Sequence, residues 1–350
     1  MSTLNTFPYI EVSGSSFEMG YQYGEQAKSL IERYLLLIER LTKLSRDDAC
    51  QKAMSYLPGI DALSPNFVEE VRGLAHGSGI SFDEALLCQV RGYAARGVVE
   101  REEGCTSYVV KGEATVDGHP LAGENQDMPV EFGDVGVVLK VIPNDGRPRA
   151  VMFTYAGLLG YHGMNEHGVS NFTNSVQDFE WQPGIPHYPL KRMILEQQNT
   201  AQCVELLRSN RVCGAANIVL CDGQGDFASV EVRPERVVLF EDDHPDRMVH
   251  TNHYLNEDFR PYESEDDIQT NSYNRLRRMR ELIQAHWGSI DVETIKQFLA
   301  DHEGDPTGIC RHGGSTVNHS IAGYIAESAK SMFHLRRGHG CIGSWAAYEV

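Results

Sequence analysis

The residue best suited to chemistry in this chain is Cys105, which follows Gly104 at the end of the charged segment 101–103. The thiolate is the nucleophilic form of cysteine, and a glycine carbonyl is open to attack because glycine has no Cβ. We predict that the Cys105 sulfur attacks the Gly104 carbonyl, and that the acyl group shifts from nitrogen to sulfur. Water then releases the two fragments, and the hydroxyl groups of Thr106 and Ser107 can hydrogen-bond the intermediate.

Cleavage before Cys105 also creates the base that the thiol needs. The new N-terminus carries a free α-amino group, whose unperturbed pKa is about 7.7–8.0. A terminal amine can take the proton of the nucleophile, as it does for an N-terminal threonine, so no histidine is required. The connector from Gly97 to Gly104 becomes charged at Glu100, and we expect it to be exposed and cleavable. The alternative is that Cys105 is a small core residue that opens a strand.

Three polar segments downstream carry further candidates, at residues 123–127, 250–254 and 308–314. An aspartate can hold a new amino terminus, an asparagine amide can donate to an oxyanion, and an arginine can bind a carboxylate through a bidentate fork. The alternatives are structural, because aspartate and asparagine at strand ends are commonly turn residues and an arginine among glycines is commonly solvated. His250 and His253 could form a metal pair, but residues three apart on a strand point to opposite faces, so we expect no metal there.

The composition excludes several classes of partner. The chain has 350 residues, with 31 Lys and Arg against 49 Asp and Glu, which gives a net charge of −18. Such a surface repels phosphate backbones, so we expect no nucleic-acid partner. No apolar run approaches the length of a membrane span, and residues 1–12 lack the pattern of a signal peptide. We therefore expect a cytoplasmic protein with no membrane partner.

The eight cysteines form no C-x-x-C pair, so the sequence supports neither a zinc ribbon nor a thioredoxin-like site. In a cytoplasmic chain of this size they are expected to be reduced thiols. We predict no metal and no cofactor, and we interpret every cysteine except Cys105 as core packing or incidental. These seven are Cys50, Cys88, Cys203, Cys213, Cys221, Cys310 and Cys341.

The elements that must position these residues change type at Cys105. Upstream, apolar residues recur at helical spacing, and Gly20 and Gly24 let another element approach the first helix closely. The helices predicted there cover residues 16–43, 47–56 (ended by Pro58), 66–76 and 82–96, the last opened by the capping box Ser81-x-x-Glu84. A short strand is predicted over 8–12.

Downstream of Cys105 the pattern is mostly that of strands. They are predicted near residues 106–110, 121–125, 135–142, 150–155, 169–175, 215–221, 227–233, 236–240, 248–254, 315–326 and 330–337, with helices over 189–198, 201–209, 271–286 and 291–302. Runs of strands interrupted by pairs of helices indicate an α+β fold of antiparallel sheets with helices packed outside. The first 104 residues add a helical layer rather than a separate domain.

Ordered motifs over nearly the whole chain resemble those of the acyl-coenzyme A:6-aminopenicillanic acid acyltransferase family, the self-processing N-terminal-nucleophile (Ntn) hydrolases of peptidase family C45. Any one motif alone is weak, but their order makes the resemblance specific. The motifs are Ile10-Glu11-Val12-Ser13-Gly14, Glu18-Met19-Gly20-Tyr21-Gln22-Tyr23-Gly24, Gly104-Cys105-Thr106, Gly123-x-Asn125-x-Asp127, Gly163-Met164-Asn165-x-x-Gly168-Val169, His250-Thr251-Asn252-His253, Ser272-Tyr273-Asn274-Arg275-x-x-Arg278-Met279 and Ile309-Cys310-Arg311.

The resemblance implies an αββα sandwich and autocleavage between Gly104 and Cys105. The products would be an α chain, residues 1–104, and a β chain, residues 105–350, which stay together as one integrated domain. It also implies amide hydrolysis or acyl transfer through a thioester on Cys105. By motif position, Asp127, Asn252 and Arg311 match the family's active-site residues. Asn252 would support the oxyanion, and the other two would order the amino terminus and the substrate.

The resemblance leaves the substrate open. We expect hydrolysis of a small N-acyl amide, with an acyl-coenzyme A-dependent N-acyltransferase and a non-catalytic binding protein as alternatives. The basic residues Arg275, Arg277, Arg278 and Arg280 are compatible with a coenzyme A donor, but we interpret them as a solvated helix face. A papain-like protease would need a different cysteine segment. Residues 338–341 depart from the family pattern, which expects a proline-containing turn there.

Overall fold

Two β-sheets lie face to face between two layers of helices in the computed structural model, which describes residues 5–94, 104–176, 178, 180–263, 268–313 and 318–350. This arrangement is the αββα sandwich that the family resemblance implies. No helix in these ranges is both long enough and apolar enough to cross a membrane.

The first sheet has eight strands in the order β1-β4-β5-β6-β7-β8-β9-β10. Neighbours pair antiparallel, except that β1 pairs parallel with β4. Its strands are β1 (Tyr9–Gly14), β4 (Gly136–Pro143), β5 (Ala150–Tyr155), β6 (His162–Asn165), β7 (Ser170–Asn174), β8 (Ala216–Cys221), β9 (Phe227–Arg233) and β10 (Arg236–Phe240). The prediction of antiparallel sheets therefore holds for every neighbouring pair of this sheet except the one formed by the N-terminal strand.

The second sheet has six strands in the order β11-β2-β3-β12-β13-β14, all paired antiparallel. Its strands are β2 (Gly104–Val110), β3 (Leu121–Pro129), β11 (Arg247–His250), β12 (Asn318–Glu327), β13 (Met332–Arg337) and β14 (Ser344–Glu349). The register of β2 and β3 places Cys105 opposite Gln126 and Gly104 opposite Asp127. Between Ser320 and Ala322 the pairing of β12 with β3 shifts by a bulge.

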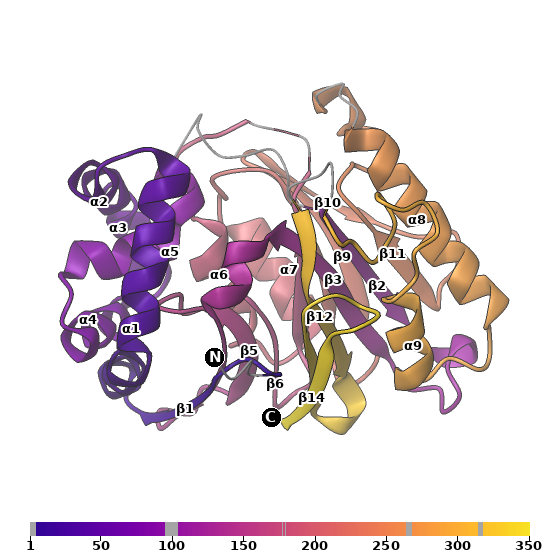
Figure 1. Ribbon diagram of the computed structural model, residues 1–350, viewed down its shortest axis with the longest axis horizontal. Helices are drawn as coiled ribbons and strands as arrows, with labels where there is room; N and C mark the ends of the chain where they lie inside the picture. Colours follow the sequence, from indigo (N-terminus) through magenta and orange to yellow (C-terminus); the bar gives the residue numbers. More distant parts are fainter. Residues whose placement is uncertain (1–4, 95–103, 177, 179, 264–267, 314–317) are drawn as a thin grey trace.

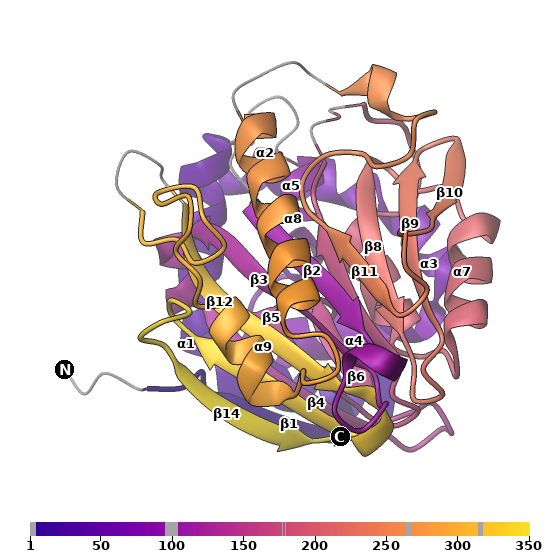
Figure 2. The same ribbon diagram turned by 90° about the vertical axis from the view of Figure 1, so that its right-hand side faces the viewer.

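The helices form the two outer layers, as Figures 1 and 2 show. They are α1 (Ser16–Thr42), α2 (Arg46–Met54), α3 (Leu57–Leu63), α4 (Pro65–Ser78), α5 (Phe82–Ala94), α6 (His187–Ile194), α7 (Thr200–Ser209), α8 (Ile268–Ala285) and α9 (Val292–Phe298). Helices α1 to α7 lie on the side of the eight-stranded sheet, whereas α8 and α9 lie across the six-stranded sheet (Figure 2). Short 3₁₀ turns occur at Gly112–Ala114, Val130–Asp134, Arg260–Tyr262 and Ser328–Lys330.

Close packing of α1 on α4 depends on glycine, as the sequence predicts. A Cβ on Gly20 would lie 2.0 Å from the Glu70 carbonyl oxygen, and one on Gly24 would lie 2.5 Å from that of Leu74. Ser15 and Glu18 form a reciprocal capping box that starts α1. The helical layer thus packs directly onto the sheets, and Ile31 and Leu35 of α1 share one apolar core with Leu139 and Phe153.

One sequence prediction is wrong, one strand was missed, and one prediction falls largely outside the described residues. Pro58 does not simply end a helix, because α2 stops at Met54 and the proline lies in the first turn of α3, where its missing N–H costs nothing. The final strand, Ser344–Glu349, was not predicted. The predicted connector lies outside the described residues except for Gly104, which is already the first residue of β2.

Candidate active site

Cys105 is buried in β2, and both of its backbone polar groups are held by side chains from other elements. Its N–H donates to Asn252 Oδ1 at 2.9 Å. Its carbonyl oxygen accepts from Arg275 Nη1 at 2.6 Å. The amide nitrogen that a cleavage before Cys105 would turn into an amine is therefore in contact with a hydrogen-bond acceptor.

Asn252 reaches this place because β11 pairs with β2 and ends opposite Ser107. Its backbone N–H donates to Ser272 Oγ at 2.7 Å, and its Nδ2 donates to the Ser175 carbonyl at 2.8 Å. Oδ1 accepts from Arg275 Nη2 at 2.7 Å as well as from Cys105 N. Because Oδ1 accepts hydrogen bonds and Nδ2 donates one, only one orientation of the Asn252 amide satisfies all of these partners.

Arg275 also belongs to this site, so the prediction that it lies on a solvated helix face is wrong. It is only 1% exposed, so it is no part of a solvated helix face, whereas the Arg277 side chain is 55% exposed. Besides Cys105 and Asn252, it binds Thr106 Oγ1 at 2.9 Å and Asn271 Oδ1 at 2.7 Å. Burial lowers its pKa to about 9, and the charge of Arg311 acts in the same direction.

A sequence signal for the burial of Arg275 existed. Residues 272, 275, 276, 279 and 283 recur at helical spacing along α8, and all five are buried. Four of them are apolar or small, and the fifth is Arg275. An arginine on the buried stripe of an amphipathic helix must find fixed acceptors, because an unpaired buried charge is costly. The helical periodicity therefore distinguishes Arg275, which is buried, from the less buried basic residues Arg277, Arg278 and Arg280.

Asp127 and Arg311 lie together over Gly104. Asp127 Oδ1 accepts from Ser320 Oγ at 2.6 Å, and Arg311 Nε lies 3.4 Å from Asp127 Oδ2. A Cβ on Gly104 would come within 2.6 Å of Arg311 Nη1 and 3.0 Å of Asp127 Oδ2. The glycine thus leaves room for both groups. Burial raises the pKa of Asp127, while Arg311 and then Arg275 oppose that shift.

Glu124 lies on the other face of the strand pair, and the sequence analysis did not single it out. Its carboxylate hydrogen-bonds the Cys105 side chain and accepts from Ser107 Oγ at 3.1 Å. Burial raises its pKa to about 8, against the lowering effect of the hydrogen bond with Cys105 and the charge of Lys191. A carboxyl group with this pKa exchanges protons near neutral pH. The alternation of side chains along β3 could have identified Glu124. Residues 124 and 126 point to one face of the strand, whereas residues 125 and 127 point to the other.

A buried chain of polar groups continues from Glu124. His162 Nδ1 is 3.6 Å from Glu124 Oε1, and its Nε2 is 3.3 Å from Lys191 Nζ. Burial, followed by the Lys191 charge, lowers the His162 pKa well below its ordinary value. The His162 ring is therefore neutral.

Other polar residues singled out in the sequence lie elsewhere. Asn125 donates to the carbonyls of Leu299 and Ile309, at 3.2 Å and 2.6 Å. His250 Nε2 is 2.9 Å from Glu231, and His253 Nδ1 is 2.8 Å from Ser272 Oγ. The two rings of the H-x-x-H pattern therefore have separate partners.

The four candidates Cys105, Asp127, Asn252 and Arg311 thus converge on the Gly104–Cys105 peptide bond. The Cys105 thiol contacts a carboxyl group on one face of the strand pair. On the other face, an acceptor and two guanidinium groups surround the backbone. This arrangement suits attack on a carbonyl next to the thiol, with positive charge available for the oxygen that becomes negative.

Comparison with known proteins relates this chain to acyltransferases. Residues 117–339 match the family described as acyl-coenzyme A:6-aminopenicillanic acid acyl-transferase. The chain is 26% identical over 332 residues to the acyl-coenzyme A:6-aminopenicillanic-acid-acyltransferase 40 kDa form of Emericella nidulans, covering 92% of this chain and 91% of that protein. It is 23% identical over 350 residues to an uncharacterized protein of Archaeoglobus fulgidus, covering 83% of this chain and 57% of that protein.

Among solved structures, a mutant of the conjugated bile acid hydrolase from Clostridium perfringens superposes with a TM-score of 0.50. The match covers 70% of this chain and 97% of that one at 12% sequence identity. At this identity the similarity shows a shared fold.

Proposed function

The chain belongs to the acyl-coenzyme A:6-aminopenicillanic acid acyl-transferase family, and from that premise we propose that it is a self-processing hydrolase of small N-acyl amides. The family description and the Emericella nidulans relative both name an acyltransferase. In our proposal Cys105 cleaves the chain before itself and then serves as the N-terminal nucleophile. The mature enzyme consists of residues 1–104 and 105–350.

The observation that carries this proposal is the acceptor that contacts Cys105 N. Asn252 Oδ1 can hold one N–H of a free α-amine and orient the nitrogen lone pair toward the sulfur of the same residue. That lone pair then takes the thiol proton, as a terminal amine does for other N-terminal nucleophiles. A cysteine that only packs in a core would also need an acceptor for its buried N–H. The acceptor supports the proposal because Glu124, Asp127 and Arg311 meet at the same peptide bond.

Self-cleavage requires a base before the amine exists, and we assign this task to Glu124. Its carboxylate takes the Cys105 thiol proton as sulfur bonds to the Gly104 carbonyl carbon. The C–N bond then breaks, the nitrogen gains a proton to become the amine, and residues 1–104 remain attached to sulfur as a thioester. Water hydrolyses that thioester, which leaves a Gly104 carboxylate and a free thiol.

Turnover repeats this chemistry on a bound amide. The Cys105 sulfur attacks the amide carbonyl while its own amine takes the proton and passes it to the leaving nitrogen. The acyl group stays on sulfur until water releases it as an acid. In this scheme Arg311 and Asp127 order the amino terminus and the substrate end, and Asn252 supports the oxyanion.

We favour hydrolysis over transfer from acyl-coenzyme A because the basic residues of α8 other than Arg275 already have acidic partners. Arg278 binds Asp301 at 2.6 Å, and Arg280 binds Asp242 at 3.1 Å. Arg277 is paired with Glu281. This cluster therefore offers little net positive charge to a phosphate-rich donor, on a chain with a net charge of −18.

The products of cleavage are expected to stay together. The apolar core joins Ile31 and Leu35, from the first 104 residues, to Leu139 and Phe153 of the eight-stranded sheet. Separating the chains would expose this core to water. The two products therefore form one domain rather than two.

Intact mass measurement under denaturing conditions tests the proposal. The wild-type chain of 39.1 kDa should give two fragments, one of which begins at Cys105, and the processed protein should hydrolyse members of a panel of short acyl amides and β-alanyl amines. The variant C105A should remain whole and inactive. A wild-type chain that never splits, or one that splits and turns over no amide or thioester, would favour the non-catalytic binding protein.

A further inference from the structure

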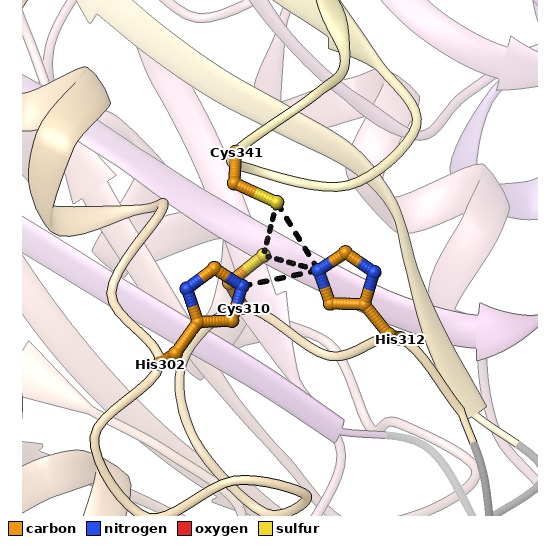
Figure 3. A group of neighbouring side chains, drawn as sticks. All are labelled: His302, Cys310, His312 and Cys341. Carbon is orange, nitrogen blue, oxygen red and sulfur yellow. Dashed lines mark hydrogen bonds between the residues drawn. The ribbon is translucent and has the colours of Figure 1, made fainter.

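Four side chains with metal-binding atoms converge on loops beside the six-stranded sheet, one of which also carries Arg311 of the candidate active site. They are His302, Cys310, His312 and Cys341, which we call the Cys/His cluster (Figure 3). One ligand atom from each lies within 4.8 Å of those of the other three. Cys310 is buried and the others are exposed. Their rings and sulfur atoms point toward a common centre in Figure 3.

The distances within the Cys/His cluster resemble those of a tetrahedral zinc site. With Zn–S of about 2.3 Å and Zn–N of about 2.0–2.1 Å, tetrahedral angles separate two nitrogens by about 3.3 Å, nitrogen and sulfur by about 3.6 Å, and two sulfurs by about 3.8 Å. The two histidine Nε2 atoms are 3.0 Å apart, and the two sulfurs are 4.0 Å apart. His312 Nε2 lies 3.7 Å from Cys310 Sγ and 3.1 Å from Cys341 Sγ.

Hydrogen bonding alone does not account for this convergence. His302 Nε2 and both sulfurs all lie against one atom, His312 Nε2. A neutral imidazole nitrogen has either one proton or one lone pair, so it can serve one of these partners well but not three. A cation at the centre would be a shared partner for all four ligand atoms.

The backbone segments that carry the Cys/His cluster pack closely against their neighbours. Cys310 N–H donates to the Asp301 carbonyl at 2.9 Å, which joins the segments that carry Cys310 and His302. A Cβ on Gly340 would lie 2.0 Å from the Leu299 carbonyl oxygen, so only glycine lets the turn before Cys341 pack there. Gly338 has a φ of 89°, which favours glycine at the start of this turn.

We propose that His302, Cys310, His312 and Cys341 bind one Zn²⁺ ion through two imidazole nitrogens and two thiolates. Two thiolates and two imidazoles form a closed structural set, which leaves no open position for a substrate. Each thiol releases a proton as it binds, so the ligands carry two negative charges that balance the cation. The site joins three segments, which are separate in sequence, at one edge of the sandwich.

The site also bears on Arg311, which stands between two of the ligands. Cys310 and His312 would hold the backbone on both sides of Arg311, whose carbonyl accepts from Ser320 N at 3.1 Å and lies 2.7 Å from His339 Nδ1. Zinc would therefore act as a positioning group for the guanidinium over Gly104. The binding of zinc itself is independent of what Cys105 does.

The experiment uses the full-length protein, purified with reduced thiols, incubated with excess zinc sulfate and then freed of loose metal by gel filtration. Mass spectrometry of the metal should give about one zinc per chain. The variants H302Q and C341S, both at exposed positions, should retain less than a tenth of that zinc. The variant H119Q alters an exposed histidine outside the cluster and should bind as the wild type does.

Cobalt and heat provide two further readouts. Co²⁺ in place of zinc should give the visible absorption of a tetrahedral site together with a thiolate charge-transfer band, which C341S should lose. Zinc should raise the melting temperature of the wild type by several degrees and that of H302Q by much less. A wild type that binds no zinc under reducing conditions overturns the proposal. So does zinc that survives both substitutions, or a Cys310–Cys341 disulfide in place of the metal.

Discussion

The candidate active site around Cys105 and the Cys/His cluster both include residues of the short segment 310–312. The two sites differ in the groups that surround their sulfur atoms. The Cys105 site is buried, and Asn252 and Arg275 hold the backbone of the cysteine itself. In the Cys/His cluster, three of four residues are exposed and the side chains face one another. Arg311 belongs to the first site, while its neighbours Cys310 and His312 belong to the second.

This difference teaches what a thiol needs for each task. A nucleophile needs a proton acceptor and polar groups arranged around the bond that it attacks, and these must be in place before the reaction. A metal ligand needs other soft donors at tetrahedral spacing and no fixed acceptor of its own. Both sites use cysteine, and the surrounding groups determine whether its sulfur is suited to act as a nucleophile or as a metal ligand.

The largest expected difference is between the two cysteines. C105A should abolish both self-cleavage and turnover, because no other atom can form the thioester. C341A should still split before Cys105 and retain turnover, since it removes only a proposed metal ligand. Intact mass and amide hydrolysis measure both outcomes. Complete processing of C105A would remove Cys105 from the mechanism.

Asn252 should have the next largest effect. N252A removes both the acceptor for Cys105 N and the amide N–H that we propose supports the oxyanion. We expect turnover to fall by about 10²–10³-fold, the cost of losing one oxyanion donor. N274A, at an exposed position of α8, is the control and should keep full activity. The kcat of the processed fraction is the measurement. A loss confined to KM would mean that Asn252 only binds substrate.

Glu124 should control self-cleavage through its raised pKa. The carboxyl group is protonated below about 8 and accepts the thiol proton only above it, so the cleavage rate should rise with pH through this range. E124Q should cleave about 100-fold more slowly and lose that pH dependence. The time course of the intact mass between pH 6 and pH 9 tests this. An unchanged pH profile in E124Q would mean that another group takes the proton.

Arg275 should matter through the shape of its guanidinium as well as its charge. R275K keeps a positive charge, but it lacks the planar fork and has only three N–H donors for the four acceptors of Arg275. We therefore expect a loss of about 10–100-fold in kcat. R277K, two residues along the same helix and exposed, should change activity by less than about twofold. Equal effects of both substitutions would place the contribution in the helix rather than in the site.

Removal of zinc should have the smallest catalytic effect. A chelator should leave self-cleavage intact and lower kcat by about tenfold or less, because Arg311 loses support on both sides but keeps its contact with Asp127. Added zinc should restore the rate in the wild type and fail to do so in C341S. An abolished reaction would indicate that the metal takes part in the chemistry instead.

Much of the fold followed from local pattern. Strands β9 and β10 lie at their predicted residues, and the capping box at Ser81 and Glu84 was correctly located at the start of α5. The strand Ser344–Glu349 was missed because its residues are only partly buried at the edge of a sheet and show little alternation. Helix α3 was missed because Pro58 was interpreted as the end of a helix rather than the beginning of one.

The sequence by itself predicted an α+β fold of antiparallel sheets and pointed to Cys105 as a candidate, because periodicity and the Gly104–Cys105 junction are local properties of the chain. Only the tertiary structure decided which polar side chains meet. Glu124 reaches Cys105 through the pairing of β2 with β3, and Arg275 reaches it by lying on the buried face of α8. The four ligands of the Cys/His cluster come from three separate segments, and spacing along a chain does not encode distance between residues that a sheet and its turns bring together.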